Sequence, residues 1–148
     1  MYTATGMVKA LAMENSTMLE VLNIIVKLVE AAKNDDWNSV DAQIQSAVNK
    51  EGVAWACGIG LLDESPQVRD LAASILEKAN PTEFPLHDLA RAKLHALLKS
   101  DENQYVRYRS AFALWTRHVR DDEVMRTMHQ AALDRDVGEI AKEYFAEK

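Results

Sequence analysis

One pattern of residues occurs twice along this chain and restricts the folds that are open to it. Asp63 is followed, after four residues, by Val68-Arg69, and Asp101 is followed by Val106-Arg107 at the same spacing. Each copy comes after the apolar end of one expected helix and before the start of the next, so the repeated unit is a helical hairpin. One hairpin cannot bury both of its faces alone, whereas stacked hairpins can. The pattern therefore predicts a row of stacked hairpins.

Two weaker copies extend the pattern toward the two ends of the chain. Asp35 precedes Val40 at the same spacing, but Asp41 takes the place of the arginine. Toward the C-terminus, Leu133-Asp134 leads to Val137-Gly138 through a shorter turn, also without an arginine. The outer repeats of such arrays are atypical because they cap the stack. Four hairpins are therefore expected.

The composition agrees with a helical domain. The chain has 148 residues, of which 48% are hydrophobic and 27% are charged, and this suits one globular domain rather than a disordered chain. With 5 Gly and 3 Pro, it lacks the turn residues that an all-β domain needs. We expect residues 1–16 to form an N-terminal segment and residues 17–148 to form a single repeat domain. Apolar periodicity and capping residues predict eight helices in four pairs, at about 17–33, 38–49, 51–62, 66–79, 85–99 and 103–119, then from about 121 and from about 137.

Charge and cysteine content exclude several classes of protein. The net charge is −6. Because non-specific nucleic-acid binding depends on cationic side chains that neutralise phosphates, a nucleic-acid partner is disfavoured. Lys27, Glu30 and Lys33 interrupt the most apolar stretch, so no membrane-spanning helix is expected. The single cysteine cannot form an intramolecular disulfide, and no signal-peptide pattern is visible. An intracellular, cytoplasmic protein is expected.

The two full copies resemble the HEAT and HEAT-like repeat family, whose units carry an aspartate in the turn between helices and a Val-Arg pair at the start of the second helix. The resemblance covers about residues 17–148 and implies an all-α fold, a right-handed α-solenoid of about four helical hairpins. It also implies that aspartate and arginine side chains tie the turns of successive repeats together. By this resemblance, Asp63, Arg69, Asp101 and Arg107 form a structural ladder between repeats.

The segment 103–119 differs from the repeat that precedes it. After a shift of 38 residues, the positions of Leu71, Ala72 and Ala79 are taken by Arg109, Ser110 and Arg117. The stripe that should face the core is therefore interrupted by polar residues.

A separate stripe of aromatic residues runs along the same segment at helical spacing. One hypothesis makes it a recognition surface for another protein that offers an acidic or extended segment, because aromatic and arginine side chains dominate binding hot spots. The alternative buries the rings between neighbouring repeats and pairs the arginines with the acids at positions 121–123. The candidate partner-binding residues are Tyr105, Tyr108, Arg109, Trp115 and Arg117.

The first helix carries more apolar surface than one neighbour can cover. Thr17 and Glu20 have the spacing of a capping box that would begin this helix near residue 17. Its apolar residues leave a narrow polar strip, so something else must pack against it. Residues 7–13 folding back as a cap would meet that need, which is usual for the end of a repeat array. The alternative is a homodimer through the apolar first helix.

The sequence indicates no catalytic residue, metal site or cofactor. The four histidines lack metal-ligand spacing, and Cys57 lies in an apolar segment where a thiol acts as a small hydrophobe. Gly58 and Gly60 indicate close approach of helices rather than a phosphate-binding loop. The function we favour is a non-catalytic protein–protein interaction module or assembly adaptor. Two alternatives within the HEAT-like resemblance stay open: an enzyme of the phycobilin lyase type, and a nucleic-acid-binding protein similar to the HEAT-like alkylpurine DNA glycosylases.

Overall fold

The computed structural model describes the backbone of residues 4–147 and the side chains of residues 17–147. All regular structure in that part of the chain is helical, which confirms the expected all-α class. Eight α-helices are present there, as expected, together with two short 3-10 helices. They are α1 (Ala4–Lys33), α2 (Trp37–Gln43), η1 (Ile44–Ala47), α3 (Lys50–Gly58), η2 (Gly60–Leu62), α4 (Pro66–Lys78), α5 (Asp88–Ser100), α6 (Gln104–Trp115), α7 (Asp122–Ala132) and α8 (Gly138–Ala146).

Polar residues mark the starts of several helices. Asn49, Asn103 and Asp121 accept hydrogen bonds from backbone N–H groups in the first turns of α3, α6 and α7, respectively. These bonds satisfy donors that a helix N-terminus otherwise leaves unpaired. Pro66 is the first residue of α4, at the expected boundary, and the hydroxyl of the preceding Ser65 bonds to the Gln67 side chain rather than capping the helix. Local sequence thus accounts for these boundaries.

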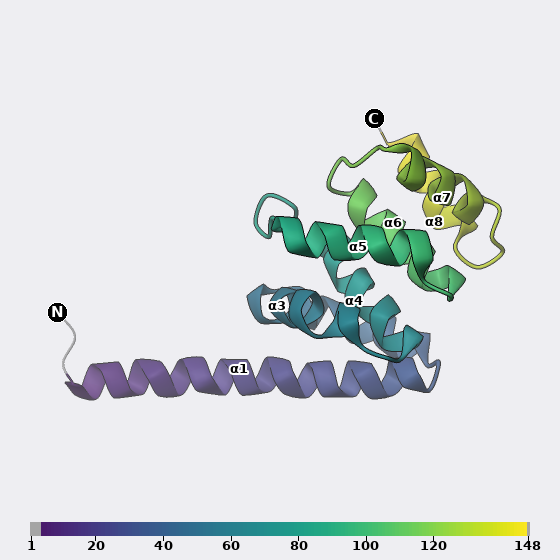
Figure 1. The fold of residues 1–148 in the computed structure, drawn as a ribbon. Coiled ribbons are helices and arrows are strands. Elements are labelled where there is room, and N and C mark those ends of the chain that lie inside the picture. The colour runs from purple at the N-terminus through teal and green to yellow at the C-terminus, as the bar shows by residue number, and fades with distance from the viewer. Residues whose placement is uncertain (1–3, 148) are drawn as a thin grey trace.

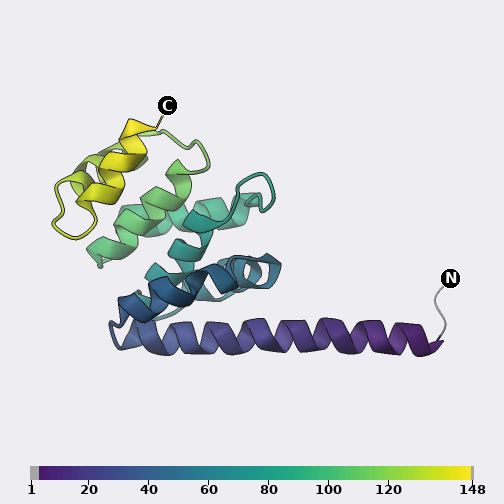
Figure 2. The ribbon, with the colours of Figure 1, turned by 180° about the vertical axis from the view of Figure 1, so that it is seen from behind.

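The N-terminal segment is the main departure from expectation. Residues 4–16 continue α1 as one helix, so residues 7–13 do not fold back as a cap. Thr17 lies inside this helix and therefore does not begin it. The expected break failed because the segment contains no proline, and its single glycine, Gly6, weakens a helix by only about 1 kcal/mol. The N-terminal half of α1 projects beyond the other helices in both ribbon views (Figures 1 and 2).

Helices that follow one another along the chain pack in pairs. The pairs are α1 with α2, α3 with α4, α5 with α6, and α7 with α8. Contacts of α4 with α1 and α6, and of α6 with α7, join these pairs to one another. The first helix and the α7–α8 pair consequently lie at opposite ends of the molecule (Figures 1 and 2). The stripe predicted for the core side of α4 is buried throughout: Val68, Leu71, Ala72, Ile75, Leu76 and Ala79.

The 38-residue alignment of α4 with α6 also holds in space. Ser110 and Arg117 are buried, and the side chain of Arg109 is 19% exposed. All three therefore face inward, as their apolar counterparts on α4 do. Two acidic side chains of α4, Asp70 and Glu77, are buried as well. Arg109 pairs with both of these acids, so the interface of α4 and α6 combines specific pairing with apolar contact.

Of the two glycines near the end of α3, one lies where its backbone closely approaches other residues. A Cβ atom added to Gly60 would lie 2.6 Å from the Cβ of Ala72 and 2.9 Å from the ring of Trp55. The predicted close approach is confirmed at this position. At Gly58 an added Cβ would meet open space, so the same prediction is wrong there.

Candidate functional site

The same kind of hydrogen bond forms in three of the turns between paired helices. Asp63, Asp101 and Asp134 each accept a bond from the backbone N–H two residues further on, at 2.8, 2.9 and 2.8 Å, respectively. Such a bond holds the backbone in a turn before the next helix begins. In the first turn, Asp35 adopts a left-handed backbone conformation with φ 55°, and Asp36 caps α2. The weak C-terminal copy thus resembles the two full copies more closely than the N-terminal copy does.

Arg69 connects its own turn to the next one. Its Nε and Nη2 donate to the two carboxylate oxygens of Asp101, at 2.8 and 3.2 Å, and its Nη1 donates to the carbonyls of Asp63 and Glu64. Arg107 donates to the carbonyl of Asp101 at 2.7 Å, the same bond that Arg69 makes to Asp63. The structure therefore brings the four predicted ladder residues together. Asp63 takes part through its backbone carbonyl, while its carboxylate accepts the bond within its own turn.

Arg109 lies between two acidic side chains of α4. Its Nη1 donates to Glu77 at 2.9 Å, its Nε donates to Asp70 at 3.4 Å, and Tyr144 of α8 donates its hydroxyl to Glu77. Burial raises the pKa of Asp70 to about 6, although the Arg109 charge opposes this shift. Burial also disfavours the charged form of Arg109, but Glu77 and Asp70 outweigh it and raise its pKa. Arg109 thus joins α4 to α6, and Glu77 extends the network to α8.

Two other arginines near the end of α6 bind backbone carbonyls. Arg117 donates to the carbonyls of Phe84 and Leu76, at 2.9 and 3.1 Å, and burial lowers its pKa. The guanidinium of Arg120 lies 3.4 Å from the centroid of the Trp115 ring and donates to the Trp115 carbonyl. Among the described residues, the bonds of Arg117 and Arg120 therefore go to the backbone and to a ring, and the predicted pairing with the acids at positions 121–123 is wrong for them.

Two rings of the aromatic stripe on α6 pack against rings of α8. The ring of Phe112 lies 5.4 Å from that of Tyr144, and the ring of Trp115 lies 5.2 Å from that of Phe145. Tyr108 and Trp115 are buried, as is Arg117. For these residues, the structure agrees with the interpretation in which the rings are buried between neighbouring hairpins. The recognition-surface hypothesis keeps its two partly exposed candidates, Tyr105 and Arg109.

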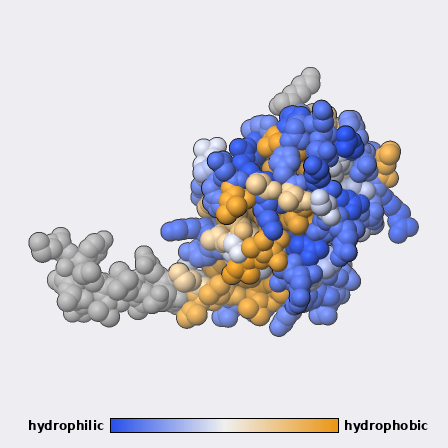
Figure 3. All heavy atoms as spheres, in the orientation of Figure 1, coloured by the Kyte–Doolittle hydropathy of each residue, from blue (hydrophilic) through white to orange (hydrophobic). Residues whose placement is uncertain are grey.

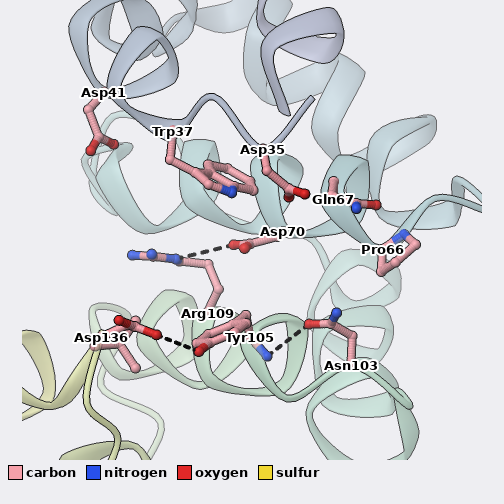
Figure 4. A pocket seen from close by; sticks show the side chains of 11 residues that line it. Asp35, Trp37, Asp41, Pro66, Gln67, Asp70, Asn103, Tyr105, Arg109 and Asp136 are labelled. Atoms are coloured by element: carbon pink, nitrogen blue, oxygen red, sulfur yellow. Dashed lines mark hydrogen bonds and ion pairs between the residues drawn. The ribbon is translucent and has the colours of Figure 1, made fainter. Parts of the chain in front are cut away.

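Tyr105 and Arg109 both line a pocket of about 460 Å³ (Figure 4). The pocket lies between the N-terminal parts of α2, α4 and α6 and the residues that lead into α8. In the close-up, Trp37 and Tyr105 lie on opposite sides of the pair formed by Asp70 and Arg109 (Figure 4). The other polar residues of the lining are Asp35, Asp41, Gln67, Asn103 and Asp136. Each helical pair contributes to this pocket through its second helix or the turn before it.

Sequence reasoning did not select several residues of this pocket. Trp37 and Asp41 belong to the weak first copy of the repeat, and Asp136 belongs to the weak last copy. A signal was present, because corresponding positions of stacked hairpins fall on one face of a repeat array. Selecting residues by their position in the repeat, instead of by aromatic periodicity within one helix, would have found them.

The titration of Asp70 makes the free energy of unfolding of the chain depend on pH. Its folded pKa, about 6, lies above the ordinary value of 3.8, so the unfolded chain releases this proton first as the pH rises. The Asp70 contribution to the free energy of unfolding should therefore fall by about 3 kcal/mol between about pH 4 and pH 7, and stay constant above that. Urea unfolding of the wild type and of Asp70→Asn across this range measures the difference, and carboxyl carbon NMR measures the midpoint directly. A midpoint near the ordinary value contradicts the prediction.

A second surface feature is the apolar stripe on α1. Met18, Leu19, Leu22 and Val26 are exposed, with Leu19 and Val26 exposed by 61% and 55%. Apolar side chains also gather over this helix in the space-filling view (Figure 3). Residues 7–13 lie further along the same helix and so cannot cover the stripe. The homodimer through this helix stays a prediction.

The described residues contain no group of three or more His, Cys, Asp and Glu side chains placed to hold a metal ion. Burial raises the pKa of the Cys57 thiol, with Arg117 opposing the shift, so the thiolate is disfavoured. Among the described helices, none combines the length and the apolar stretch that crossing a bilayer requires.

No family model matches the chain, and neither a curated protein nor a solved structure matches it.

Proposed function

We propose that this chain is a non-catalytic protein-binding module that acts as an assembly adaptor in the cytoplasm. In this proposal its four helical pairs are HEAT-like repeats and together form a short right-handed α-solenoid. The observation that carries the proposal is the pocket of Figure 4, because all four pairs line it through their second helices or the turns before them. A stack of repeats creates extended binding surfaces in this way.

The contacts between successive turns support the repeat interpretation. Arg69 binds the carbonyl of its own turn and the carboxylate of the next, and Arg107 repeats the first of these bonds. Equivalent bonds at equivalent positions are the expected product of a repeated hairpin. The contact of Arg69 with Asp101 also fixes the start of α4 relative to the start of α6, so this part of the pocket is formed before a ligand arrives. A preformed site loses less conformational entropy on binding.

Photocrosslinking from the pocket rim tests this function. The photoreactive residue p-benzoylphenylalanine would replace Gln67, which is half-buried in the lining. A matched probe would replace Leu89, which is 77% exposed on α5 and outside the pocket. We expect one protein to crosslink in its native cell from position 67 and not from position 89. We also expect the additional substitution Tyr105→Ala to abolish this crosslink while circular dichroism shows the same helix content.

Three other outcomes would overturn the proposed function. In one, the same proteins crosslink from both positions, or the Tyr105→Ala substitution leaves the crosslink unchanged. In another, the purified chain retains a tetrapyrrole, which would favour the lyase-type alternative. In the third, it retains nucleic acid with a steep salt dependence, which would favour the nucleic-acid alternative.

A further inference from the structure

The charge around the pocket of Figure 4 is strongly negative. Four aspartates line it, and Arg109 is the one cationic residue among the lining residues. Asp35, Asp41 and Asp136 are exposed at the surface, while Asp70 is buried. Carboxylates grouped in a cleft reinforce one another's field, because the low-dielectric walls screen it less than water does. A ligand that enters this pocket therefore meets a negative potential.

Arg109 does not reverse that charge. Its guanidinium is already bound to Glu77 and Asp70, so this network of one cation and two carboxylates carries a net negative charge. The guanidinium is also held in place by a buried acceptor, because the side chain of Glu77 is 3% exposed. An acidic ligand would have to compete with both carboxylates for the same donor groups. The charge of the site thus disfavours the acidic segment that the sequence suggested.

Two aromatic rings complete the site. Trp37 and Tyr105 are half-buried and lie on opposite sides of the pocket (Figure 4). The faces of indole and phenol rings attract cations, and guanidinium groups stack on them especially well. Tyr105 donates its hydroxyl to Asp136 at 2.7 Å, so one ring and one carboxylate are held together before a ligand binds. Carboxylates beside aromatic faces favour a long basic side chain, whose stem is apolar and whose end is charged.

We propose that this pocket binds a basic side chain, preferably arginine, carried by an extended segment of a partner protein. The proposal rests on the proposed function and adds the chemistry of the partner. Arginine fits better than lysine because its planar group can stack on Trp37 or Tyr105 while its N–H groups donate to the rim carboxylates.

Blocked tripeptides, acetyl-Gly-X-Gly-amide, test this proposal directly. The residue X would be arginine, lysine, the uncharged norleucine or glutamate, and nitrogen–proton correlation spectra would follow the Trp37 indole N–H and the Tyr105 amide. We expect saturable shifts with arginine, weaker ones with lysine and none with the other two. The variant Asp35→Asn/Asp41→Asn should weaken arginine binding about tenfold. The matched variant Glu139→Gln/Glu143→Gln removes two exposed carboxylates of α8 outside the pocket and should bind as the wild type does.

The outcomes separate this inference from the proposed function. Equal shifts with norleucine or glutamate would overturn the inference, and so would the absence of saturable shifts at peptide concentrations of about 10 mM. Equal loss of binding in both double variants would also overturn it, because net charge alone would then explain the effect. A pocket-dependent crosslinked segment without arginine or lysine would overturn the inference and leave the protein-binding function standing.

Discussion

Replacing Arg109 by methionine is expected to lower the free energy of unfolding by about 3–5 kcal/mol, the range measured when one partner of a buried ion pair is removed. The substitution leaves Glu77 and Asp70 buried without the guanidinium that binds them. Methionine fills much of the same volume, so the loss reports the unpaired charges rather than a cavity. Urea unfolding followed by circular dichroism at neutral pH measures the change.

Two further variants separate charge from packing in this network. The triple variant Arg109→Met/Asp70→Asn/Glu77→Gln removes all three charges and should recover a large part of the loss, because no buried charge is left unpaired. The matched variant Arg126→Met removes an arginine that is 63% exposed, and surface ion pairs contribute about 0–1 kcal/mol. A loss at Arg109 no greater than the loss at Arg126 would contradict the network described here.

Breaking the contact between Arg69 and Asp101 is expected to cost about 3 kcal/mol, because both side chains are largely removed from water. Their exposed fractions are 12% and 4%, and the two-point geometry adds to the strength of the contact. Arg69→Met loses this contact together with two bonds to carbonyls of its own turn. Urea unfolding of Arg69→Met, Asp101→Asn and the double variant gives the coupling energy, which we expect at about 2 kcal/mol.

Arg107→Met provides the internal control for that cycle. Arg107 donates to the carbonyl of Asp101, and the loss of such a bond typically costs about 1 kcal/mol. Asn at position 101 keeps an acceptor oxygen for the turn bond to the Asn103 N–H, so its effect isolates the contact with Arg69. A coupling energy near zero would show that the two turns are held together by apolar packing and not by this contact.

Local features of the sequence predicted most of the fold. Pro66 marks the start of α4, and Asp121 caps α7, because such boundary signals depend on residues within one turn of each other. The 38-residue alignment placed Arg109, Ser110 and Arg117 at positions equivalent to the α4 core stripe, and all three face inward, although Arg109 and Arg117 were candidates for a partner-binding surface. The helix start expected at residue 17 was wrong, because residues 4–16 contain no proline and continue α1 as one helix.

The candidate site was harder to predict than the fold. Aromatic periodicity selected Tyr108 and Trp115, but periodicity shows only that residues share a helix face and not what covers that face. In the structure rings of α8 pack against Phe112 and Trp115. Tyr105, a selected candidate, is partly exposed and lines the pocket, whereas Trp37 and Asp136, which also line it, were not selected.

The sequence alone determined the helical class and most helix boundaries, because these follow from contacts within a turn. The tertiary structure alone decided that the polar residues of α6 face inward and which groups they meet. Arg109 binds acids that are 32 and 39 residues away along the chain, and the pocket gathers residues from position 35 to position 137. The pocket is therefore lined mainly by carboxylates, and its one arginine, which looks free in the sequence, is neutralised by acids that packing brings to it.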